Sequence, residues 1–234
     1  MPRPRILIAG RWSDQIGNDP SEGVYVGRKL LDSVTRSGAE PIMAWPATID
    51  RAADLVGLAD AVILPGGGDL DLRPYGVAEV HPLENHQPAE QDAADVTVAR
   101  AALDAGCAIL AVCRGMQVLN VIMGGTIVQH MEETTVHHKG VRHPIDIMPG
   151  TGLETIMGAA RTIGYSWHHQ ACEELAPGLV LNASTEDGTV EGFESPDGRI
   201  LGVQWHPEID AADDSAQARL FGWLTGLALS PAQS

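Results

Sequence analysis

Basic residues are scarce in this sequence. Its 234 residues include 15 Lys and Arg against 31 Asp and Glu, which gives a formal net charge of −16. Phosphate groups repel a surface with this excess of negative charge, so we expect neither a nucleic acid nor an anionic membrane as a partner. Cysteine is scarce too, because three residues are too few, and odd in number, for a disulfide framework. A reducing, cytoplasmic location is therefore expected.

Long apolar runs are also missing. No segment approaches the ~18 apolar residues of a membrane-spanning helix, and residues 6–9 are too short for the ~7–15-residue apolar region of a secretory signal. Apolar residues nevertheless make up 44% of the chain and charged residues only 20%, a composition that favours a folded core. Since no long linker divides the sequence, we expect residues 1–234 to form a single domain.

Short apolar segments alternate along the chain with segments of helical periodicity. Buried strands are predicted at residues 6–9, 41–45, 61–65, 108–113 and 200–205. Helices are predicted at residues 25–37, 89–105, 114–123 and 219–229. Between residues 126 and 200, shorter alternating runs separated by Pro-Gly and Asp-Gly turns predict antiparallel strands. The expected fold class is α/β: an open, mostly parallel sheet with helices on both faces and appended antiparallel strands.

Cys113 lies where a predicted buried strand meets a predicted helix. The residues two positions before and after it, Ala111 and Gly115, are small, as a sharp strand-to-helix turn requires. Such a turn exposes its central residue at the carboxyl end of the sheet, where the N-terminus of the helix favours a thiolate. Cys113 is therefore a candidate nucleophile, although free cysteines are commonly buried structural thiols. Cys107 and Cys172 lack this context and are interpreted as structural.

A thiolate nucleophile needs a base that an acidic group orients, and His206-Pro207-Glu208 follows another predicted strand. Because Pro207 disfavours helix at His206, we expect this segment to be extended. In an extended segment, residues two apart face the same side, so His206 and Glu208 would point to one place. The pair predicts a base and its orienting acid, whereas a lone histidine after a strand would ordinarily be a surface or capping residue.

Five sequence blocks, in order, resemble those of class I glutamine amidotransferases, and within them the γ-glutamyl-γ-aminobutyrate hydrolase branch, peptidase family C26. The blocks lie at residues 64–69 with 74–76, 113–120 with 124–126, 166–170, 190–191 and 202–208. The resemblance implies a flavodoxin-like fold and a catalytic triad of Cys113, His206 and Glu208. It also implies an oxyanion hole formed by the backbone N–H groups of Gly67 and Arg114, where glycine allows close approach.

The same resemblance implies a set of substrate contacts, namely Gly68, Gln117, Ser166, Trp167 and His168. It implies no metal and no organic cofactor. His168 and His169 would otherwise suggest an alternative base or a metal pair, neither of which fits this family. Three further histidines, at positions 137, 138 and 143, allow a metal site, but we interpret them as a polar loop entering a strand. Structural zinc sites usually include cysteines or closer spacing.

The sequence departs from the family's pattern in three places. An Arg-Asp-x-x-Glu stretch that relatives often carry is Gln91-Asp92-Ala-Ala-Asp95 here, a common proline is Ala108, and the segment 11–23 is short. None of these changes touches the triad. They leave the identity of the leaving amine, and the rim of the pocket, undetermined.

Three functions follow from these residues. The favoured one is hydrolysis of a small-molecule γ-glutamyl amide through a γ-glutamyl thioester. The alternative is a glutaminase subunit that supplies ammonia to a separate synthetase, because no synthetase domain is expected after residue 234. The third is a non-catalytic protein that binds γ-glutamyl compounds. Whether the chain forms a homodimer stays open.

Overall fold

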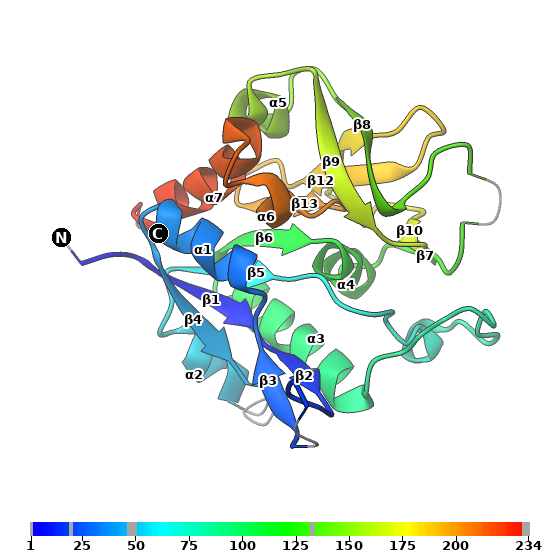
Figure 1. The fold of residues 1–234 in the computed structure, drawn as a ribbon, viewed down its shortest axis with the longest axis horizontal. Helices are drawn as coiled ribbons and strands as arrows, with labels where there is room; N and C mark the ends of the chain where they lie inside the picture. Colours follow the sequence, from blue (N-terminus) through cyan, green and yellow to red (C-terminus); the bar gives the residue numbers. More distant parts are fainter. Residues whose placement is uncertain (1, 19–20, 46–50, 132–133, 231–234) are drawn as a thin grey trace.

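The computed structural model describes residues 2–18, 21–45, 51–131 and 134–230. In these ranges eleven strands form one mixed sheet, ordered β4-β1-β5-β6-β13-β12-β11-β8-β9, with β10 beside β12 and β7 beside β10 (Figure 1). A separate two-stranded hairpin consists of β2 (Arg11–Ser13) and β3 (Gly23–Tyr25). Its strands lie at the two ends of the short segment 11–23, of which residues 19 and 20 lie outside the described ranges.

The first half of the sheet is parallel. It contains β1 (Arg5–Ala9), β4 (Glu40–Ala44), β5 (Ala61–Leu64), β6 (Ala108–Val112) and β13 (Ile200–Val203). Neighbouring strands here pair in parallel, in the spatial order β4-β1-β5-β6-β13. The second of these strands along the chain therefore lies at the edge, beside the first. This order is the flavodoxin-like arrangement, in which ligands bind at the carboxyl ends of the strands. The predicted parallel core is confirmed.

The second half of the sheet is antiparallel. It contains β12 (Val190–Glu194), β11 (Val180–Ser184), β8 (Lys139–Ile147), β9 (Arg161–Trp167), β10 (Ala171–Cys172) and β7 (Ile127–Val128). Glycines with positive φ, at positions 150, 188 and 198, form the turns that the sequence predicted. The appended antiparallel strands are therefore also confirmed.

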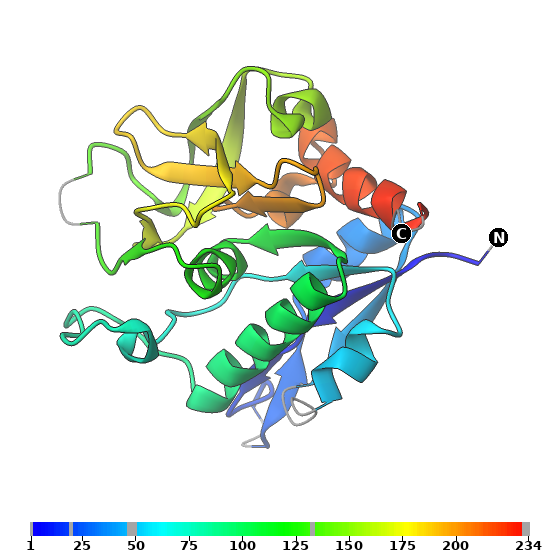
Figure 2. The ribbon, with the colours of Figure 1, turned by 180° about the vertical axis from the view of Figure 1, so that it is seen from behind.

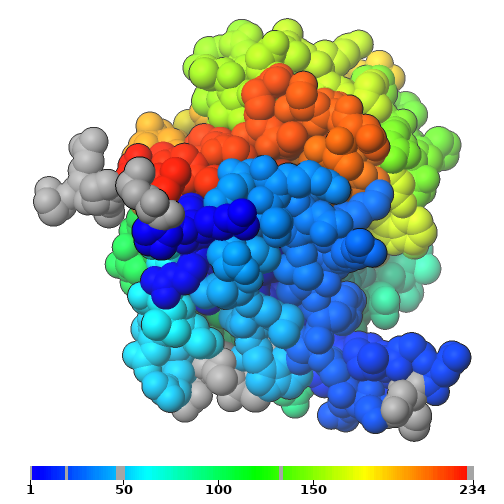
Figure 3. Space-filling view, turned by 60° about the vertical axis from the view of Figure 1, so that its left-hand side comes forward, coloured from blue at the N-terminus to red at the C-terminus, as the bar shows by residue number. Residues whose placement is uncertain are grey.

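Helices cover both faces of the sheet (Figures 1 and 2). On one face lie α1 (Arg28–Arg36), α5 (Gly152–Met157), α6 (Pro207–Asp210) and α7 (Ser215–Ala228). On the other lie α2 (Ala52–Val56), α3 (Ala89–Asp104) and α4 (Arg114–Ile122), while a 3₁₀ turn, η2 (Arg73–Tyr75), follows β5. Figure 3 shows α1 (blue) beside the orange and red C-terminal helices. Within the described ranges, no helix combines the length and the apolar character needed to cross a membrane.

Each central strand contributes to two cores. Ile6 and Ile8 of β1 pack under α1 and α7, whereas Leu7, between them, packs against the opposite layer. Because successive side chains of a strand point to opposite faces, a strand covered on both sides must be apolar throughout. This explains why the parallel strands are short uninterrupted apolar runs in the sequence.

Two predicted helix starts are wrong. The helix predicted from Tyr25 begins only at Arg28, because Tyr25 ends β3 and pairs with Arg11. The closing helix begins at Ser215, before the predicted Arg219, since the side chain of Asp214 caps it by accepting a hydrogen bond from the Ala216 N–H at 2.7 Å. In both cases a hydrogen-bonding partner, the paired strand or the capping side chain, set the boundary more strongly than the apolar periodicity.

Candidate active site

The strand-to-helix turn at Cys113 is strained. Cys113 has φ 51° and ψ −112°, and no other non-glycine residue in the described ranges has a positive φ. Its N–H donates to Val203 O of the neighbouring strand at 2.8 Å. A Cβ on Gly115 would lie 2.1 Å from Leu64 O, so only glycine fits there. The predicted sharp turn is confirmed, and the packing around it maintains its strain.

His206 and Glu208 meet, although by a route that the sequence did not predict. The expected extended segment is wrong for Glu208, because Pro207 begins the short helix α6. Proline suits the first position of a helix, since its fixed φ is helical and its missing N–H would have no partner there. His206 caps this helix with φ −103° and ψ 85°, and its Nδ1 lies 2.7 Å from Glu208 Oε1.

Cys113 and His206 lie together at the glycine loop that follows β5. A Cβ on Gly66 would lie 2.6 Å from His206 Cε1 and 3.5 Å from Cys113 Cβ. Burial lowers the pKa of His206, but the negative charges of Cys113 and Glu208 outweigh burial and raise that pKa well above the usual value for histidine. The charged, imidazolium form of His206 is therefore favoured beside Cys113.

Gly67 and Gly68 continue this loop with their backbone closely packed. A Cβ on Gly67 would lie 2.8 Å from Arg114 Cδ, and one on Gly68 would lie 2.3 Å from Gln87 Nε2. Glycine thus allows the backbone to approach the turn at Cys113. Both residues line the cleft described below.

The side chain of Arg114 lies below the loop in a buried ion-pair network. It donates to Asp92 and, at 2.8 Å, to Asp95. Arg11 donates to the same Asp95 at 2.5 Å and to Pro65 O at 3.2 Å. The two segments where the sequence departs from the family's pattern, 11–23 and 91–95, thus meet beneath the glycine loop and support it.

A cleft of about 480 Å³ opens above Gly66, Gly67, Gly68 and His206. Seven further residues line it: Arg11, Tyr25, Asn85, Gln87, Tyr165, Trp167 and Ile209. Of these residues, the sequence predicted only Trp167 as a contact. The only signal for Asn85 and Gln87 is their position in the long segment between the glycine loop and α3, because tertiary packing alone brings that segment over the site.

The remaining predicted substrate contacts differ in their exposure. Trp167 is 56% exposed and lines the cleft. Ser166 and His168 flank it and face the opposite, buried side, as alternation along β9 requires. Gln117 is buried, and its Nε2 donates to Gln170 O at 3.1 Å and to Gln204 Oε1 at 3.3 Å. Of these residues, Trp167 alone presents its side chain to the cleft.

The other two cysteines do not resemble nucleophiles. Burial raises the pKa of the Cys172 thiol to about 12, and it also raises the pKa of Cys107. A raised pKa disfavours the thiolate that a nucleophile requires, in agreement with their interpretation as structural.

The histidines near position 140 are not the polar loop that we expected. His137 is exposed, but His138 and His143 are 4% and 5% exposed. Both rings face the buried carboxylate of Glu191.

The fold is shared with a solved glutamine amidotransferase structure. A glutamine amidotransferase of Thermotoga maritima superimposes with a TM-score of 0.66 at 12% identity, covering 98% of this chain and 100% of that one. Fold and sequence blocks together define a class I glutamine amidotransferase-like protein. The chain belongs to the peptidase C26 family, whose model matches residues 13–208.

Two named relatives indicate more specifically which proteins this chain resembles. A putative glutamine amidotransferase of Mycobacterium tuberculosis is 34% identical over 194 residues, covering 79% of this chain and 62% of that protein. The γ-glutamyl-γ-aminobutyrate hydrolase of Escherichia coli is 26% identical over 246 residues, covering 91% and 95%. The protein is thus a glutamine amidotransferase-like hydrolase, and the family resemblance of its sequence is confirmed.

Proposed function

We propose that the protein hydrolyses the γ-glutamyl amide bond of a small γ-glutamyl amine and releases glutamate and the free amine. The arrangement of Cys113, His206 and Glu208 carries this proposal: a cysteine at a strained turn, an imidazole beside it, and a carboxylate 2.7 Å from that imidazole. The Escherichia coli relative, by its name, acts on γ-glutamyl-γ-aminobutyrate, and it supplies the class of substrate.

The first half of the reaction forms a thioester. The Cys113 thiolate attacks the γ-carbonyl carbon, and the resulting oxyanion accepts hydrogen bonds from the backbone N–H groups of Gly67 and Arg114. Each such donor contributes about 3 kcal/mol to the transition state of related acyl transfers. The C–N bond then breaks, and His206 gives its proton to the departing amine, leaving a γ-glutamyl thioester on Cys113.

The second half of the reaction consumes water. Neutral His206 takes a proton from a water molecule, whose oxygen attacks the thioester carbon, and the C–S bond breaks to release glutamate and the thiolate. Glu208 holds the imidazole in orientation and stabilises its charged form in both halves. Gly68 and Trp167, which line the cleft, are the proposed contacts to the γ-glutamyl group, together with the backbone beside Ser166 and His168.

A substrate panel tests this proposal. The protein alone is incubated with γ-glutamyl amides of anionic, neutral and cationic amines and with free glutamine, and released glutamate is measured. We expect at least one γ-glutamyl amide to be hydrolysed with a higher kcat/KM than glutamine. Faster hydrolysis of glutamine would instead support the alternative, a glutaminase subunit, which the name of the Mycobacterium relative favours. No hydrolysis of any compound would support the non-catalytic alternative.

The alkaline limb of the pH profile is expected to depend on Glu208. Because the pKa of His206 is raised, its imidazolium persists at neutral pH and is lost only as pH rises through that raised pKa. Since the imidazolium protonates the leaving amine, kcat/KM should fall over the same range. Glu208→Gln removes one of the charges that raise this pKa, so the alkaline limb should move to lower pH.

The exposed Glu40 provides the matched control, because Glu40→Gln changes the net charge equally at the edge strand β4. Its profile should coincide with that of the unmodified protein. An unchanged alkaline limb in Glu208→Gln would contradict the role proposed for this carboxylate.

A further inference from the structure

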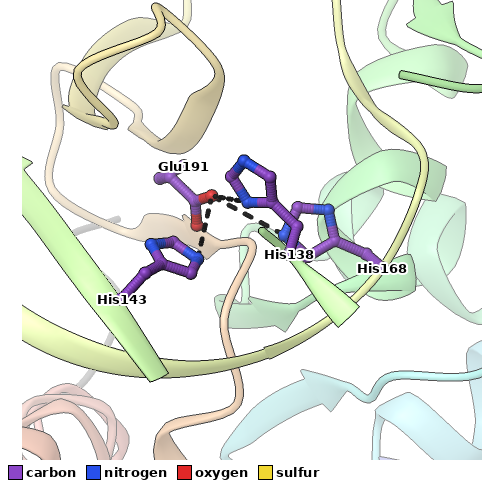
Figure 4. Close-up of side chains that lie close together, drawn as sticks. All are labelled: His138, His143, His168 and Glu191. Carbon is purple, nitrogen blue, oxygen red and sulfur yellow. Dashed lines mark ion pairs between the residues drawn. The ribbon is translucent and has the colours of Figure 1, made fainter. Parts of the chain in front are cut away.

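Three histidines and one glutamate converge in the antiparallel half of the sheet (Figure 4). His138 precedes β8, His143 lies in β8, His168 follows β9 and Glu191 lies in β12. All four are buried, and one potential ligand atom from each lies within 4.8 Å of the others. From Glu191 Oε1 the distances are 3.1 Å to His138 Nδ1, 3.6 Å to His168 Nε2 and 3.8 Å to His143 Nε2.

Most of these inward-facing atoms lack a hydrogen-bond partner among the described residues. They are both carboxylate oxygens of Glu191, Nδ1 of His138 and Nε2 of His168. A buried polar atom without a partner is costly, and a buried carboxylate more so. Four such atoms around one point indicate that a cation or a proton completes the cluster.

The outer hydrogen bonds orient the rings for a cation. His143 Nδ1 lies 3.1 Å from Pro144 O, and His168 Nδ1 lies 2.9 Å from Gln170 O. A carbonyl oxygen only accepts, so Nδ1 carries the proton in both rings and a neutral ring turns the lone pair of Nε2 inward. Metal-binding histidines characteristically donate their other N–H to a carbonyl or carboxylate in this way. The hydroxyl of Ser166, 2.8 Å from His143 Nε2, can rotate and free that lone pair.

His138 follows the same pattern with its nitrogens exchanged. Its Nδ1 faces Glu191, and its Nε2 lies 3.7 Å from Asp187 Oδ2. Asp187 is held by the hydroxyls of Thr134 and Thr185 and by the Thr189 N–H. A carboxylate fixed on the outer side of a ring nitrogen is the second common partner of a metal-bound imidazole.

The ligand atoms of the cluster, histidine nitrogens and a carboxylate oxygen, indicate which metal it would bind. Calcium and magnesium prefer oxygen ligands, whereas zinc accepts histidine nitrogen and carboxylate oxygen in tetrahedral geometry. Ligands about 2.0–2.1 Å from a tetrahedral zinc ion lie about 3.3 Å from one another. The distances from Glu191 Oε1, between 3.1 and 3.8 Å, bracket that value.

We propose that His138, His143, His168 and Glu191 bind one zinc ion in a closed, four-coordinate structural site. The ion joins β12 to the paired strands β8 and β9. Its position differs from that of the proposed reaction centre, but its ligand His168 shares a hydrogen-bond acceptor with Gln117 of α4, the helix that begins after Cys113. The carbonyl of Gln170 accepts from His168 Nδ1 at 2.9 Å and from Gln117 Nε2 at 3.1 Å. The zinc ion thus also steadies the segment that follows Trp167.

Metal analysis of the full chain tests the proposal directly. After purification without chelators and incubation with zinc sulfate, then removal of excess ion, inductively coupled plasma mass spectrometry should find about one zinc per chain. A strong chelator should remove it and lower the melting temperature, and added zinc should restore both. Cobalt(II) in place of zinc should give the visible absorption of a tetrahedral site. A chain that holds no zinc, and whose melting temperature neither chelator nor zinc changes, would overturn the proposal in favour of a proton-linked His–Glu cluster.

Three variants locate the ion. Glu191→Gln should lose most of the bound zinc, whereas His137→Ala, which removes the exposed neighbouring histidine, should keep it. Because thiolates also bind zinc, Cys113→Ala is measured in parallel and should keep its zinc as well. Loss of zinc in Cys113→Ala, or equal loss in Glu191→Gln and His137→Ala, would overturn the assignment. If Glu191→Gln does not fold, the cobalt spectrum of the unmodified chain still decides the geometry.

Discussion

Replacing Cys113 by alanine is expected to abolish the release of glutamate from γ-glutamyl amides and to leave the fold intact. Removal of a nucleophile lowers turnover by roughly 10⁴- to 10⁶-fold in other acyl-transfer enzymes. The fold should persist because alanine removes one sulfur atom and introduces no clash. Steady-state glutamate release measures the first effect, and the far-ultraviolet circular dichroism spectrum and the melting temperature measure the second.

Cys107→Ala is the matched control, since Cys107 is a half-buried thiol outside the cleft. It should retain full activity. An electrophile that mimics glutamine should label Cys113 in the unmodified protein and in Cys107→Ala, as mass spectrometry of the modified peptide can show. Undiminished turnover in Cys113→Ala would end the proposed mechanism.

Gly115→Ala is expected to destabilise the protein by roughly 3 kcal/mol or more, at the upper end of overpacking effects. The added Cβ would lie 2.1 Å from Leu64 O and 2.6 Å from Leu64 C. These are backbone atoms of β5, which is held between β1 and β6, so they cannot move aside without breaking strand pairing. The midpoint of urea unfolding measures the change.

Gly222→Ala is the control that separates the clash at Gly115 from the helix propensity of alanine. Gly222 is an exposed glycine in α7 with nothing within 4 Å of its added Cβ, so the substitution should stabilise the protein by about 0.5–1 kcal/mol. The same chemical change should thus act in opposite directions at two helical glycines. Equal effects at both positions would show that the turn at Cys113 is not tightly packed.

Strands and turns that have a strong local pattern of apolar or small residues could be predicted from the sequence. Strands β5 and β6 have no polar residue, because helices cover them on both faces, and their positions follow from composition alone. The turn at Cys113 was predictable for a similar reason, since Gly115 is small where the backbone of β5 leaves no room for a side chain. Boundaries that depend on a distant partner were not predictable, as the start of α1 beside the β2–β3 hairpin shows.

The contact between His206 and Glu208 shows how a correct pairing can follow from an incorrect conformation. Extended backbone and the first turn of a helix can both bring residues two apart within reach, so the side chains meet at 2.7 Å although Glu208 is helical. Local sequence restricted the pair to one region, and the packing of α6 determined its conformation.

Local sequence indicated which residues are candidates for catalysis and which segments are buried, because strand periodicity, small residues at the turn and the His-Pro-Glu order act over a few positions. The grouping of residues that are distant in the chain became visible only in the folded structure. Asn85 and Gln87 reach the cleft, and His138 and His168 reach Glu191, through segments that are far apart in the chain. The physical reason is that side-chain direction depends on register and packing between strands, and these interactions extend beyond any local pattern.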